Sequence, residues 1–441
     1  MTAVILPWRV LNPDALEEKV KSNKILHIHY YFPPVGTVGS LRNYCFAREL
    51  SGHFEDSHLI TLRKKPLLMQ ESLSVGFTRI HEVNNFDYRN LYEKTELTKD
   101  LNDQINANKS KKGPGLFAKI LESYPGNILW GEGGMIYVFS AIIKAKQLIR
   151  EEGITHIYSS FRPFADHYIA YRLKKAFPQL CWIADFRDLP VDKNRKNVFL
   201  PGSTDKLYRR FFSKADILTT VSEGLRKRLL DYNDRVLLMR NGSHGLFIPD
   251  KMAEPEKFTI SYTGSLYPGY QKTEALFLAI DSLIREKKID QEKIELVYAG
   301  KDRRLWLADV QKHKLGGISS IYGKVSLTES VKLQHKSHVN VMLTWNGPHT
   351  GGIITGKFSE YLTAEKPILC LINGDREPEL EEIFMKMSQS AVFYTEDIDE
   401  MANWLLRLYE KWTKGIQVKE AKSTTESWPR SVEMLRAQLR F

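Results

Sequence analysis

A glycine-rich stretch in the last third of the chain carries residue types that can hold phosphate groups. Residues 346–371 read NGPHTGGIITGKFSEYLTAEKPILCL, and glycines such as Gly352 and Gly356 leave backbone amides accessible. Lys357 follows at an expected helix start, and Glu360 comes one turn later. Amides and an ammonium group bind a diphosphate, and a carboxylate accepts hydrogen bonds from ribose hydroxyls. The pattern favours a nucleoside diphosphate; a surface Lys–Glu pair with i,i+3 spacing is the alternative.

A second candidate group lies earlier in the same half of the chain. Gly264 and Ser265 end an apolar run, and Lys272 precedes the next helical pattern. In open parallel sheets, ligands bind at the carboxyl ends of strands. These three residues are therefore candidates for the same binding edge.

Glycines also follow the first apolar run of the chain, at residues 24–32. The segment FPPVGTVGS contains Gly36 and Gly39 and precedes a helical pattern that begins near Leu41. Backbone amides in such a turn, together with a helix N-terminus, favour an anion, although a simple tight turn has the same composition. The segment lacks the GxxxxGK[ST] pattern, so a Walker-type NTPase is not supported.

Charged and polar residues mark two more strand ends in the first half. Asp185 lies within the apolar run 181–186, and Arg187 and Asp188 follow it directly. Charges next to a buried strand cost free energy unless they form ion pairs or serve a function. Asp188 lies furthest into the loop, where a substrate could reach it. His167 follows another strand. The structural alternatives are an ion pair of Asp185 with Arg187 or with another helix, and a packed histidine.

These motifs need a scaffold, and the chain alternates strand and helix patterns almost throughout. Short apolar strands are expected at 24–32, 58–62, 155–160, 181–186, 215–222, 258–266, 294–300, 338–345, 366–372 and 391–395. Continuous apolar strands between helices are typical of parallel sheets covered on both faces. A polar linker near 245–257 divides the pattern, so we expect two Rossmann-like α/β/α domains, at 1–247 and 248–425, and a final helix within 426–441.

Length and composition narrow the class of protein. The chain has 441 residues, of which 42% are hydrophobic and three are cysteines. Two or three domains with real cores are expected, without a disulfide framework or metal-ligand spacing of cysteines. The start does not read as a secretory signal, and no run approaches the roughly 20 apolar residues of a membrane span. We expect a cytoplasmic protein, either soluble or peripheral on the cytoplasmic face of a membrane.

The positive charge is concentrated in the first half. The net charge is +11, and residues 1–250 carry 37 basic and 27 acidic side chains against 27 and 26 in residues 251–441. The range 191–230 alone holds ten basic and four acidic residues. Such a field favours an anionic partner, whereas a solvated surface is the alternative. Motifs for reading nucleic acid are lacking, so an anionic membrane or a phosphate-linked lipid acceptor is the better explanation.

Taken together, the motifs resemble those of GT-B glycosyltransferases, specifically the GT4-like group (glycosyl transferases group 1). The first half contributes FPPVGTVGSLRNYCFAREL, SSFRPFADH, ADFRDLP and ADILTTVSEGL, and the second half contributes YTGSLYPG, LVYAGK and GKFSEYLTAEKPIL. The resemblance covers nearly the whole chain. It implies a nucleotide-sugar donor on the second domain, an acceptor on the first, and transfer in the cleft between them.

The resemblance also implies chemical and residue-level expectations. Such enzymes generally retain the anomeric configuration and need no metal, and their last helix, here within 426–441, crosses back onto the first domain. By position, Gly36 and Gly39 match the loop that faces the donor phosphates and the acceptor. Glu360 matches the ribose-binding second Glu of the E-x7-E motif, and Lys272 matches the phosphate-binding Lys.

The sequence departs from the family pattern at two donor positions. Gly352 stands where the motif has its first Glu, and Ser265 stands where many members have Arg. Loss of that Arg removes a charge that stabilises the leaving diphosphate, for which Lys357 or Arg240 could compensate. His167 matches the sugar-contacting His of the family loosely.

The sequence thus favours a glycosyltransferase that moves a sugar from a nucleotide-sugar donor to a hydroxyl of a glycan or lipid-linked saccharide. Asp188 and His167 are expected to line the sugar and acceptor side. Two alternatives remain open. One is a nucleotide-sugar 2-epimerase on the same fold, and the other is a non-catalytic relative that binds nucleotide or glycan.

Overall fold

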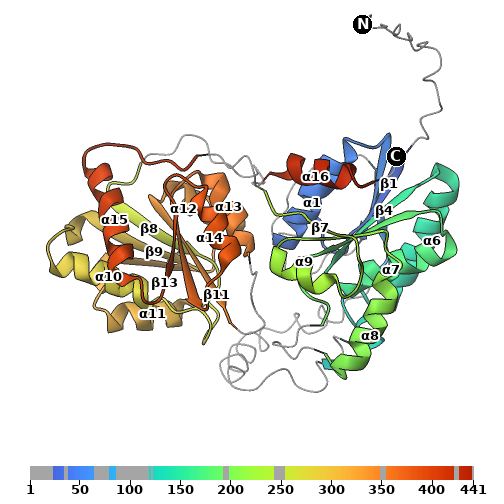
Figure 1. The fold of residues 1–441 in the computed structure, drawn as a ribbon, viewed down its shortest axis with the longest axis horizontal. Helices are drawn as coiled ribbons and strands as arrows, with labels where there is room; N and C mark the ends of the chain where they lie inside the picture. The colour runs from blue at the N-terminus through green and yellow to red at the C-terminus, as the bar shows by residue number, and fades with distance from the viewer. Residues whose placement is uncertain are drawn as a thin grey trace, which may run out of the picture.

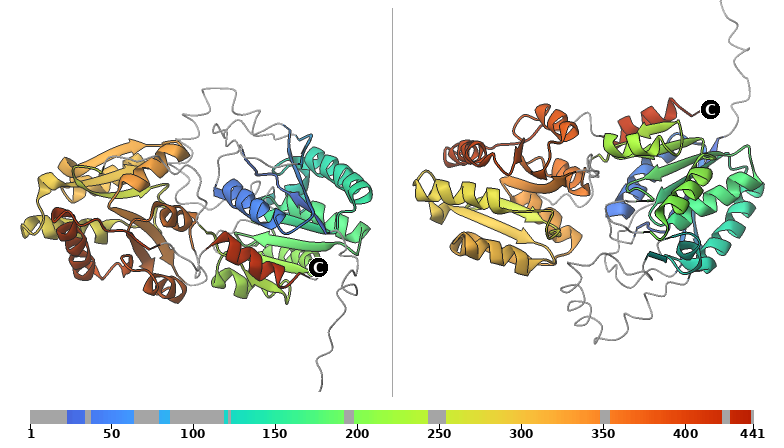
Figure 2. Two further views of the ribbon diagram at one scale, coloured as in Figure 1. Left: turned by 90° about the horizontal axis from the view of Figure 1, so that it is seen from above. Right: turned by 60° about the horizontal axis from the view of Figure 1, so that its bottom comes forward.

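The chain forms two all-parallel α/β bodies, which stand beside one another in Figure 1 and Figure 2. The computed structural model describes residues 23–33, 38–63, 79–85, 119–120, 123–191, 198–242, 254–347, 354–421 and 427–439. Within these ranges, no helix is both long and apolar enough to cross a lipid bilayer. The expected domain boundaries at 247/248 and 425/426 lie outside the described residues.

The first sheet has the strand order β3-β2-β1-β4-β5-β6-β7. Its strands are β1 (Lys24–Ile28), β2 (Asp56–Leu62), β3 (Arg79–Val83), β4 (His156–Phe161), β5 (Cys181–Phe186), β6 (Ile217–Thr220) and β7 (Val236–Leu238). The described residues of this domain form the helices α1 (Val38–Ser51), α5 (Gly126–Leu129), α6 (Gly134–Glu152), α7 (Phe164–Ala176), α8 (Pro201–Phe212) and α9 (Glu223–Leu229). Every strand pair in the sheet is parallel, as expected from the continuous apolar runs.

The second sheet repeats this arrangement with the order β10-β9-β8-β11-β12-β13. Its strands are β8 (Phe258–Thr263), β9 (Ile294–Ala299), β10 (Ser319–Gly323), β11 (Val339–Asn346), β12 (Ile368–Gly374) and β13 (Ala391–Tyr394). The helices are α10 (Glu274–Arg285), α11 (Arg303–Lys312), α12 (Leu327–Lys336), α13 (Gly356–Ala364), α14 (Pro378–Met385) and α15 (Ile398–Thr413). Two Rossmann-like domains are therefore confirmed.

The strand orders determine which edges can bind ligands. In each sheet the first strand of the domain lies inside the sheet, in the order β2-β1-β4 or β9-β8-β11. The next strand or strands along the chain lie on one side of it, and the chain then crosses to its other side. The loops leaving the carboxyl ends of such a pair diverge and open a crevice for a ligand. Residues that follow β1, β4, β8 and β11 are thus the candidates for ligand binding.

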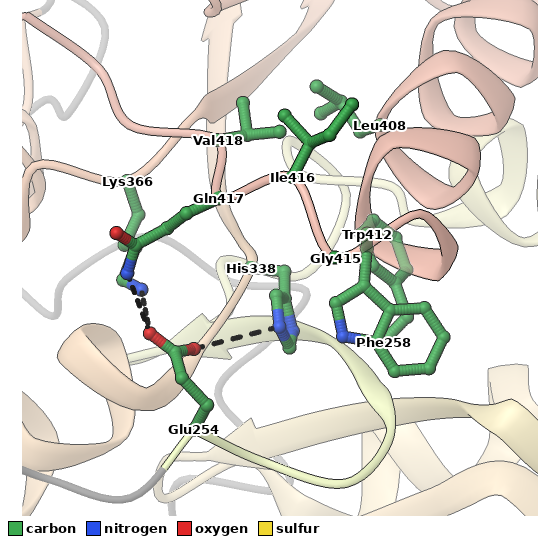
Figure 3. Close-up of a pocket in the computed structure, with 10 residues that line it drawn as sticks. All are labelled: Glu254, Phe258, His338, Lys366, Leu408, Trp412, Gly415, Ile416, Gln417 and Val418. Atoms are coloured by element: carbon green, nitrogen blue, oxygen red, sulfur yellow. Dashed lines mark hydrogen bonds and ion pairs between the residues drawn. The ribbon is translucent and has the colours of Figure 1, made fainter.

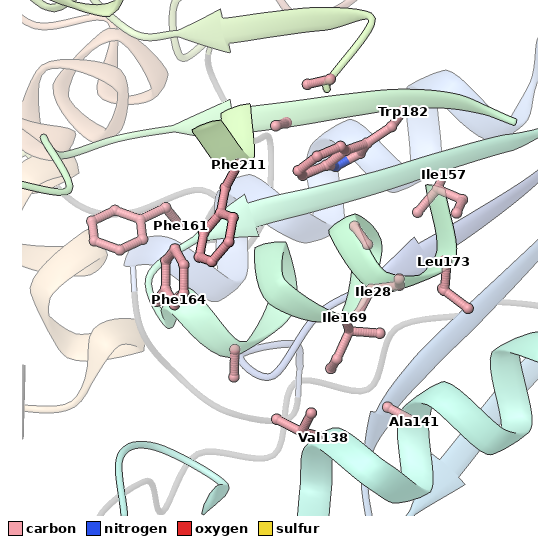
Figure 4. Close-up of a cluster of buried hydrophobic side chains, with 14 of the residues drawn as sticks. Ile28, Val138, Ala141, Ile157, Phe161, Phe164, Ile169, Leu173, Trp182 and Phe211 are labelled. Carbon is pink, nitrogen blue, oxygen red and sulfur yellow. The ribbon is translucent and has the colours of Figure 1, made fainter. Parts of the chain in front are cut away.

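A packed core holds the first of these edges in place. Figure 4 shows side chains of α7, such as Ile169 and Leu173, between the strand residues Ile28 and Ile157 and the helix α6. These side chains are at most 1% exposed. Close packing of this kind leaves little freedom for the strand ends above it.

The chain ends with α16 (Trp428–Arg436), which packs on α1 of the first domain although it follows the second (Figure 1). Trp428 and Val432 are almost fully buried there, and the rings of Trp428 and Phe46 are 4.9 Å apart between centroids. The expected return of the last helix to the first domain is confirmed.

A buried ion pair joins α1 to the centre of the first sheet. Arg42 and Asp185 are 2% and 0% exposed, and Arg42 donates from Nε to Oδ2 (3.0 Å) and from Nη2 to Oδ1 (2.7 Å). Asp185 also accepts from the hydroxyls of Ser160 and Thr219 at 3.0 and 2.8 Å. Burial alone would raise the pKa of Asp185, but the Arg42 charge and these hydrogen bonds lower it. Of the two alternatives considered for Asp185, the partner on another helix is the one observed.

Removing the charge of Arg42 tests this pair. We expect Arg42→Met to lower the free energy of unfolding by about 3–5 kcal/mol in urea denaturation, since it leaves Asp185 buried without its partner. Because the folded-state pKa of Asp185 is lowered, the stabilisation is present at neutral pH and is lost as the pH falls through that pKa. Arg48→Met is the control, because Arg48 makes an exposed pair with Glu49 worth about 1 kcal/mol or less. Equal losses in both variants would contradict the account.

Candidate functional site

The loop after β8 crosses the carboxyl edge of the second sheet. It begins at Gly264, whose φ of 129° is a conformation that L residues rarely adopt, and whose amide donates to the Ala299 carbonyl at 2.7 Å. Further along, Gln271 Nε2 donates to the Leu343 carbonyl at 2.7 Å. The Lys272 amide donates to Asn373 Oδ1 at 2.6 Å, and its side chain is exposed. The loop is thereby tied to the ends of β9, β11 and β12.

Lys357 brings a partly buried ammonium group to the start of this loop. It lies in the first turn of α13, donates from Nζ to the Tyr262 hydroxyl, and sits 4.0 Å from the centroid of that ring. A Cβ on Gly264 would fall 2.3 Å from Lys357 Cε, so the two residues are in direct contact. Burial lowers the pKa of Lys357 to about 8, with Glu360 and Asp302 opposing the shift. The Tyr262 hydroxyl donates in turn to the Ser265 carbonyl at 2.6 Å.

Glu360 lies one turn further along α13 and is 8% exposed. Its Oε2 accepts from Gln334 Nε2 of α12 at 3.0 Å, and the same nitrogen lies 2.9 Å from Thr263 Oγ1 at the end of β8. Burial raises the pKa of Glu360, which Gln334 and Lys357 oppose. The carboxylate therefore braces two helices against the strand beneath Lys357.

Three aromatic side chains flank this edge, and the sequence analysis did not identify them. Tyr267 and Tyr270 are 50% and 55% exposed, and their ring centroids lie 5.2 and 5.4 Å from that of Trp345 at the end of β11. Large exposed rings beside a binding edge offer flat surfaces for stacking. For the two tyrosines, the signal in the sequence is the YPGY segment at 267–270, which begins three residues after Gly264.

In the first domain, Gly39 and Arg187 meet at the carboxyl edge. A Cβ on Gly39 would fall 1.7 Å from Arg187 Nη1, so only glycine leaves room for the guanidinium there. Arg187 donates to the carbonyls of Phe161 and Arg162 at 3.0 and 3.1 Å. Burial lowers the pKa of Arg187, and the carboxylates of Asp185 and Asp188 oppose the shift. Asp188 follows in the same turn and is partly exposed.

His167 lies below this edge, inside the core. It is 1% exposed, its Nδ1 is 2.8 Å from Ser159 Oγ, and its ring lies 4.7 Å from that of Phe186 and 5.3 Å from that of Phe212. Burial lowers its pKa to about 3, so the imidazole is neutral. In this conformation the side chain packs against aromatic rings and does not reach the edge.

The structure therefore gathers the predicted residues in two places. Gly264, Ser265, Lys357 and Glu360 lie around the carboxyl end of β8 in the second domain, whereas Lys272 lies beside Asn373 near the carboxyl end of β12, two strands away. Gly39 and Asp188 lie around the carboxyl ends of the strands in the first domain. Gly36 and Gly352 are outside the described residues.

Arg240 was a candidate to replace the family Arg that is absent at Ser265. In the structure it pairs instead with a carboxylate of the second domain. Its Nε and Nη2 donate to Glu379 Oε1 on α14 at 3.2 and 2.5 Å. The Glu379 carboxylate also accepts from the Glu223 amide at the start of α9, at 2.8 and 3.0 Å. Glu379 thus links the second domain to two segments of the first. Lys357, and not Arg240, therefore places a positive charge next to Gly264.

A hollow of about 310 Å³ lies at the opposite edge of the second sheet (Figure 3). Phe258, at the amino end of β8, and Trp412, at the end of α15, form its apolar side. Glu254 lies 3.9 Å from both Lys366 and His338 on its polar side. Since it opens at the amino ends of the strands, it is separate from the edge that carries Lys357.

Comparison with known proteins identifies the architecture. No protein-family model matches the sequence, and a search of curated proteins finds no match. Solved structures do match over nearly the whole chain. Sucrose-phosphate synthase from Thermosynechococcus elongatus aligns with a TM-score of 0.55 and 12% identity, covering 94% of each chain. The chain has the GT-B fold.

Other GT-B structures match to a similar extent. The apo structure of OtsA aligns with a TM-score of 0.56 and 10% identity, covering 95% of this chain and 100% of the other. A UDP-N-acetylglucosamine 2-epimerase aligns with a TM-score of 0.52 and 13% identity, covering 94% and 95%. At such identities the likeness concerns the fold, and the chemistry has to be argued from the residues.

Two glycines with positive φ provide a test of the contact with Lys357. Gly264→Ala adds a Cβ that overlaps the Lys357 side chain, whereas a Cβ on Gly269, with φ of 82°, meets nothing within 4 Å. Both variants bear the backbone penalty of about 1–2 kcal/mol, and Gly264→Ala adds the clash. We expect it to lower the Tm by several degrees more than Gly269→Ala in calorimetry. Equal Tm shifts in the two variants would show that the contact between Gly264 and Lys357 does not affect stability.

Proposed function

We propose that this GT-B protein is a glycosyltransferase of the GT4-like type. It transfers a sugar from a nucleotide-sugar donor such as a UDP- or GDP-sugar to a hydroxyl of a glycan or lipid-linked saccharide, with retention and without a metal. The observation that carries the proposal is the partly buried Lys357 ammonium beside Gly264, at the carboxyl end of β8.

The donor side follows from the charges at this edge. The glycosidic C–O bond to the diphosphate breaks during transfer, and the leaving group takes the bonding electrons and gains charge. An ammonium group and backbone amides next to the phosphates stabilise that charge more strongly in a partly buried site than in water. Lys357, the amides of the Gly264 loop and the start of α13 would supply these groups, and Glu360 would accept from the ribose.

The acceptor side belongs to the first domain in this proposal. Arg187 is held at its carboxyl edge by two backbone carbonyls, with Asp188 next to it and Gly39 against its guanidinium. A fixed guanidinium binds phosphate or sugar hydroxyls with little loss of side-chain freedom. Asp188 would orient the acceptor hydroxyl. His167 is too deeply buried in this conformation to take the sugar contact assigned to it by resemblance.

A lipid-linked acceptor is favoured by an exposed apolar face on α6. Ile136, Phe139 and Ile143 follow one another at helical spacing and are 51%, 58% and 70% exposed, and Trp130 just before the helix is 60% exposed. Helix α6 follows β3 and precedes β4 along the chain, so it runs from the carboxyl edge of the sheet to its amino edge. These residues lie in its first half and therefore toward the edge that carries Gly39. Apolar side chains on a domain with an excess of basic residues suit an anionic membrane surface.

Nucleotide-sugar affinity tests the donor site. We expect Lys357→Met to weaken binding of UDP-glucose and GDP-mannose, whichever binds, by about ten- to a hundredfold, the worth of a charge-assisted hydrogen bond. Since the pKa of Lys357 is about 8 and the phosphates favour the ammonium form, wild-type affinity is full below that pH and falls above it. The variant loses this pH dependence. Titration calorimetry from about pH 7 to about pH 9 measures both effects.

Lys332→Met is the matched control, because Lys332 pairs with Glu329 on the exposed face of α12. Its affinity should equal that of the wild type. Failure of a broad donor panel to bind would contradict the donor site. Binding without turnover in a panel of acceptors would favour the non-catalytic alternative. Two features support that alternative: Ser265 replaces the family Arg, and Arg240 is paired with Glu379. Epimer formation without acceptor would favour the epimerase.

Liposome flotation tests the membrane-linked acceptor. Wild-type protein should float with anionic vesicles and not with neutral ones. The double variant Phe139→Ser/Ile143→Ser should lose this binding, since it removes apolar area from the exposed face. Met385→Ser/Leu305→Ser is the control, because these side chains are 78% and 40% exposed in the second domain. If the two double variants float to the same extent, the exposed face of α6 does not contribute to membrane binding.

A further inference from the structure

A cluster of histidine and carboxylate side chains lies at the amino edge of the first sheet, opposite the edge that carries Gly39. Asp56 and His58 are on β2, two residues apart and therefore on one face of the strand. Glu152 is the last residue of α6, which ends at this edge. One ligand atom of each of the three residues lies within 4.8 Å of the other two.

His58 is the central member of this cluster. It is 1% exposed, and its Nε2 is buried without a hydrogen-bond partner, 3.4 Å from Asp56 Oδ2. Its other ring nitrogen, Nδ1, is 3.1 Å from Nε2 of His81 on β3, and the two rings are stacked with centroids 5.3 Å apart. When Nδ1 donates to His81 Nε2, the lone pair of the His58 ring lies on Nε2, the nitrogen that faces the carboxylates. A neutral imidazole has one lone pair to give to a ligand.

We propose that Asp56, His58 and Glu152 bind a divalent transition-metal ion of the Zn²⁺ class, with a water as the fourth ligand. One imidazole nitrogen and two carboxylates are ligands that Zn²⁺ takes at about 2.0–2.2 Å in tetrahedral sites. The two carboxylates balance the charge of the ion. The bond from His58 Nδ1 to His81 would orient the ring, as hydrogen bonds to ligating histidines do in metal sites.

The cluster already contains cations that compete for the carboxylates. Arg79 Nη1 lies 3.0 Å from Asp56 and 3.4 Å from Glu152, and Lys24 lies 4.0 Å from Glu152. These ion pairs satisfy the carboxylates, whereas His58 Nε2 lies 3.4 Å from Asp56 Oδ2 without the geometry of a hydrogen bond. Arg79 is 49% exposed on an edge strand, so its side chain can turn into solvent when an ion enters. Glu152, at 33% exposure on a helix end, can approach the other two ligands.

The ion would have a structural role. It would join β2 to the end of α6, on the side of the domain away from the transfer site. Metal binding here is therefore independent of the proposed glycosyltransferase activity, because metal-free transfer would take place at the opposite edge of the sheet.

Metal titration of the full chain, prepared without a histidine tag and stripped by a chelator, tests this site. Co²⁺ should bind with one equivalent per chain, give the visible absorption of a tetrahedral site, and be displaced by Zn²⁺, which should raise the Tm. Glu152→Gln should weaken binding at least about tenfold, since it removes a charged ligand. Glu151→Gln, one residue earlier and exposed, should leave binding unchanged.

Arg79→Met separates the metal site from a plain ion-pair network. If the cluster binds metal, removal of the competing guanidinium should tighten Co²⁺ binding by about tenfold or more. If the cluster is an ion-pair network only, the variant loses stability and gains no metal affinity. Absence of stoichiometric Co²⁺ binding by both wild type and Arg79→Met, or equal binding by Glu152→Gln and Glu151→Gln, would overturn the proposal.

Discussion

Parallel strands can be joined only through crossovers, and this constraint determines where both halves of the chain present polar residues. Every strand of a parallel sheet ends at the same edge, so the loops that leave the strands are collected there. In the first domain this edge brings Gly39 and Arg187 together, although they are far apart in the sequence. In the second domain it brings Gly264 against Lys357. In the proposed glycosyltransferase, these two edges would form the donor and acceptor halves of the transfer site.

The two domains treat their buried charges differently. Arg42 is saturated, because its guanidinium contacts the Asp185 carboxylate, Asn241 and the Met239 carbonyl. Such a pair stabilises the folded core and has nothing left for a ligand. Lys357 instead donates to a neutral hydroxyl and lies over an aromatic ring, with Glu360 one turn away. Its lowered pKa of about 8 reflects this incomplete compensation, which an anionic ligand would complete.

Much of the architecture was readable from the sequence, because buried parallel strands are continuous apolar runs. The return of α16 to α1 was expected by resemblance and is observed. The edge strand β3 was not predicted, since RIHEV is polar and four of its five residues retain some exposure. Local sequence also did not indicate that Asp185 pairs with Arg42 or that His167 is enclosed by rings from β5 and α8. Those arrangements depend on contacts between distant segments.

The candidate site was predictable to a similar degree. Glycines and charged residues at strand ends predict Gly264, Lys357 and Glu360 as neighbours, since strand ends follow from the apolar pattern, and the structure brings these three residues together. The aromatic group of Tyr267, Tyr270 and Trp345 was missed because β11 and the loop after β8 meet only in the folded sheet. Exposure likewise cannot be read from residue type, which is why His167 was assigned to the site and Arg187 was not.

We propose that Lys357 and the Gly264 loop hold the diphosphate of the donor. A crystal structure of the protein with UDP or GDP bound tests it most directly. We expect phosphate oxygens within hydrogen-bond distance of Lys357 Nζ and of backbone amides in the Gly264 loop or the first turn of α13. A nucleotide bound elsewhere, for example in the hollow at the amino edge of the second sheet, would contradict it.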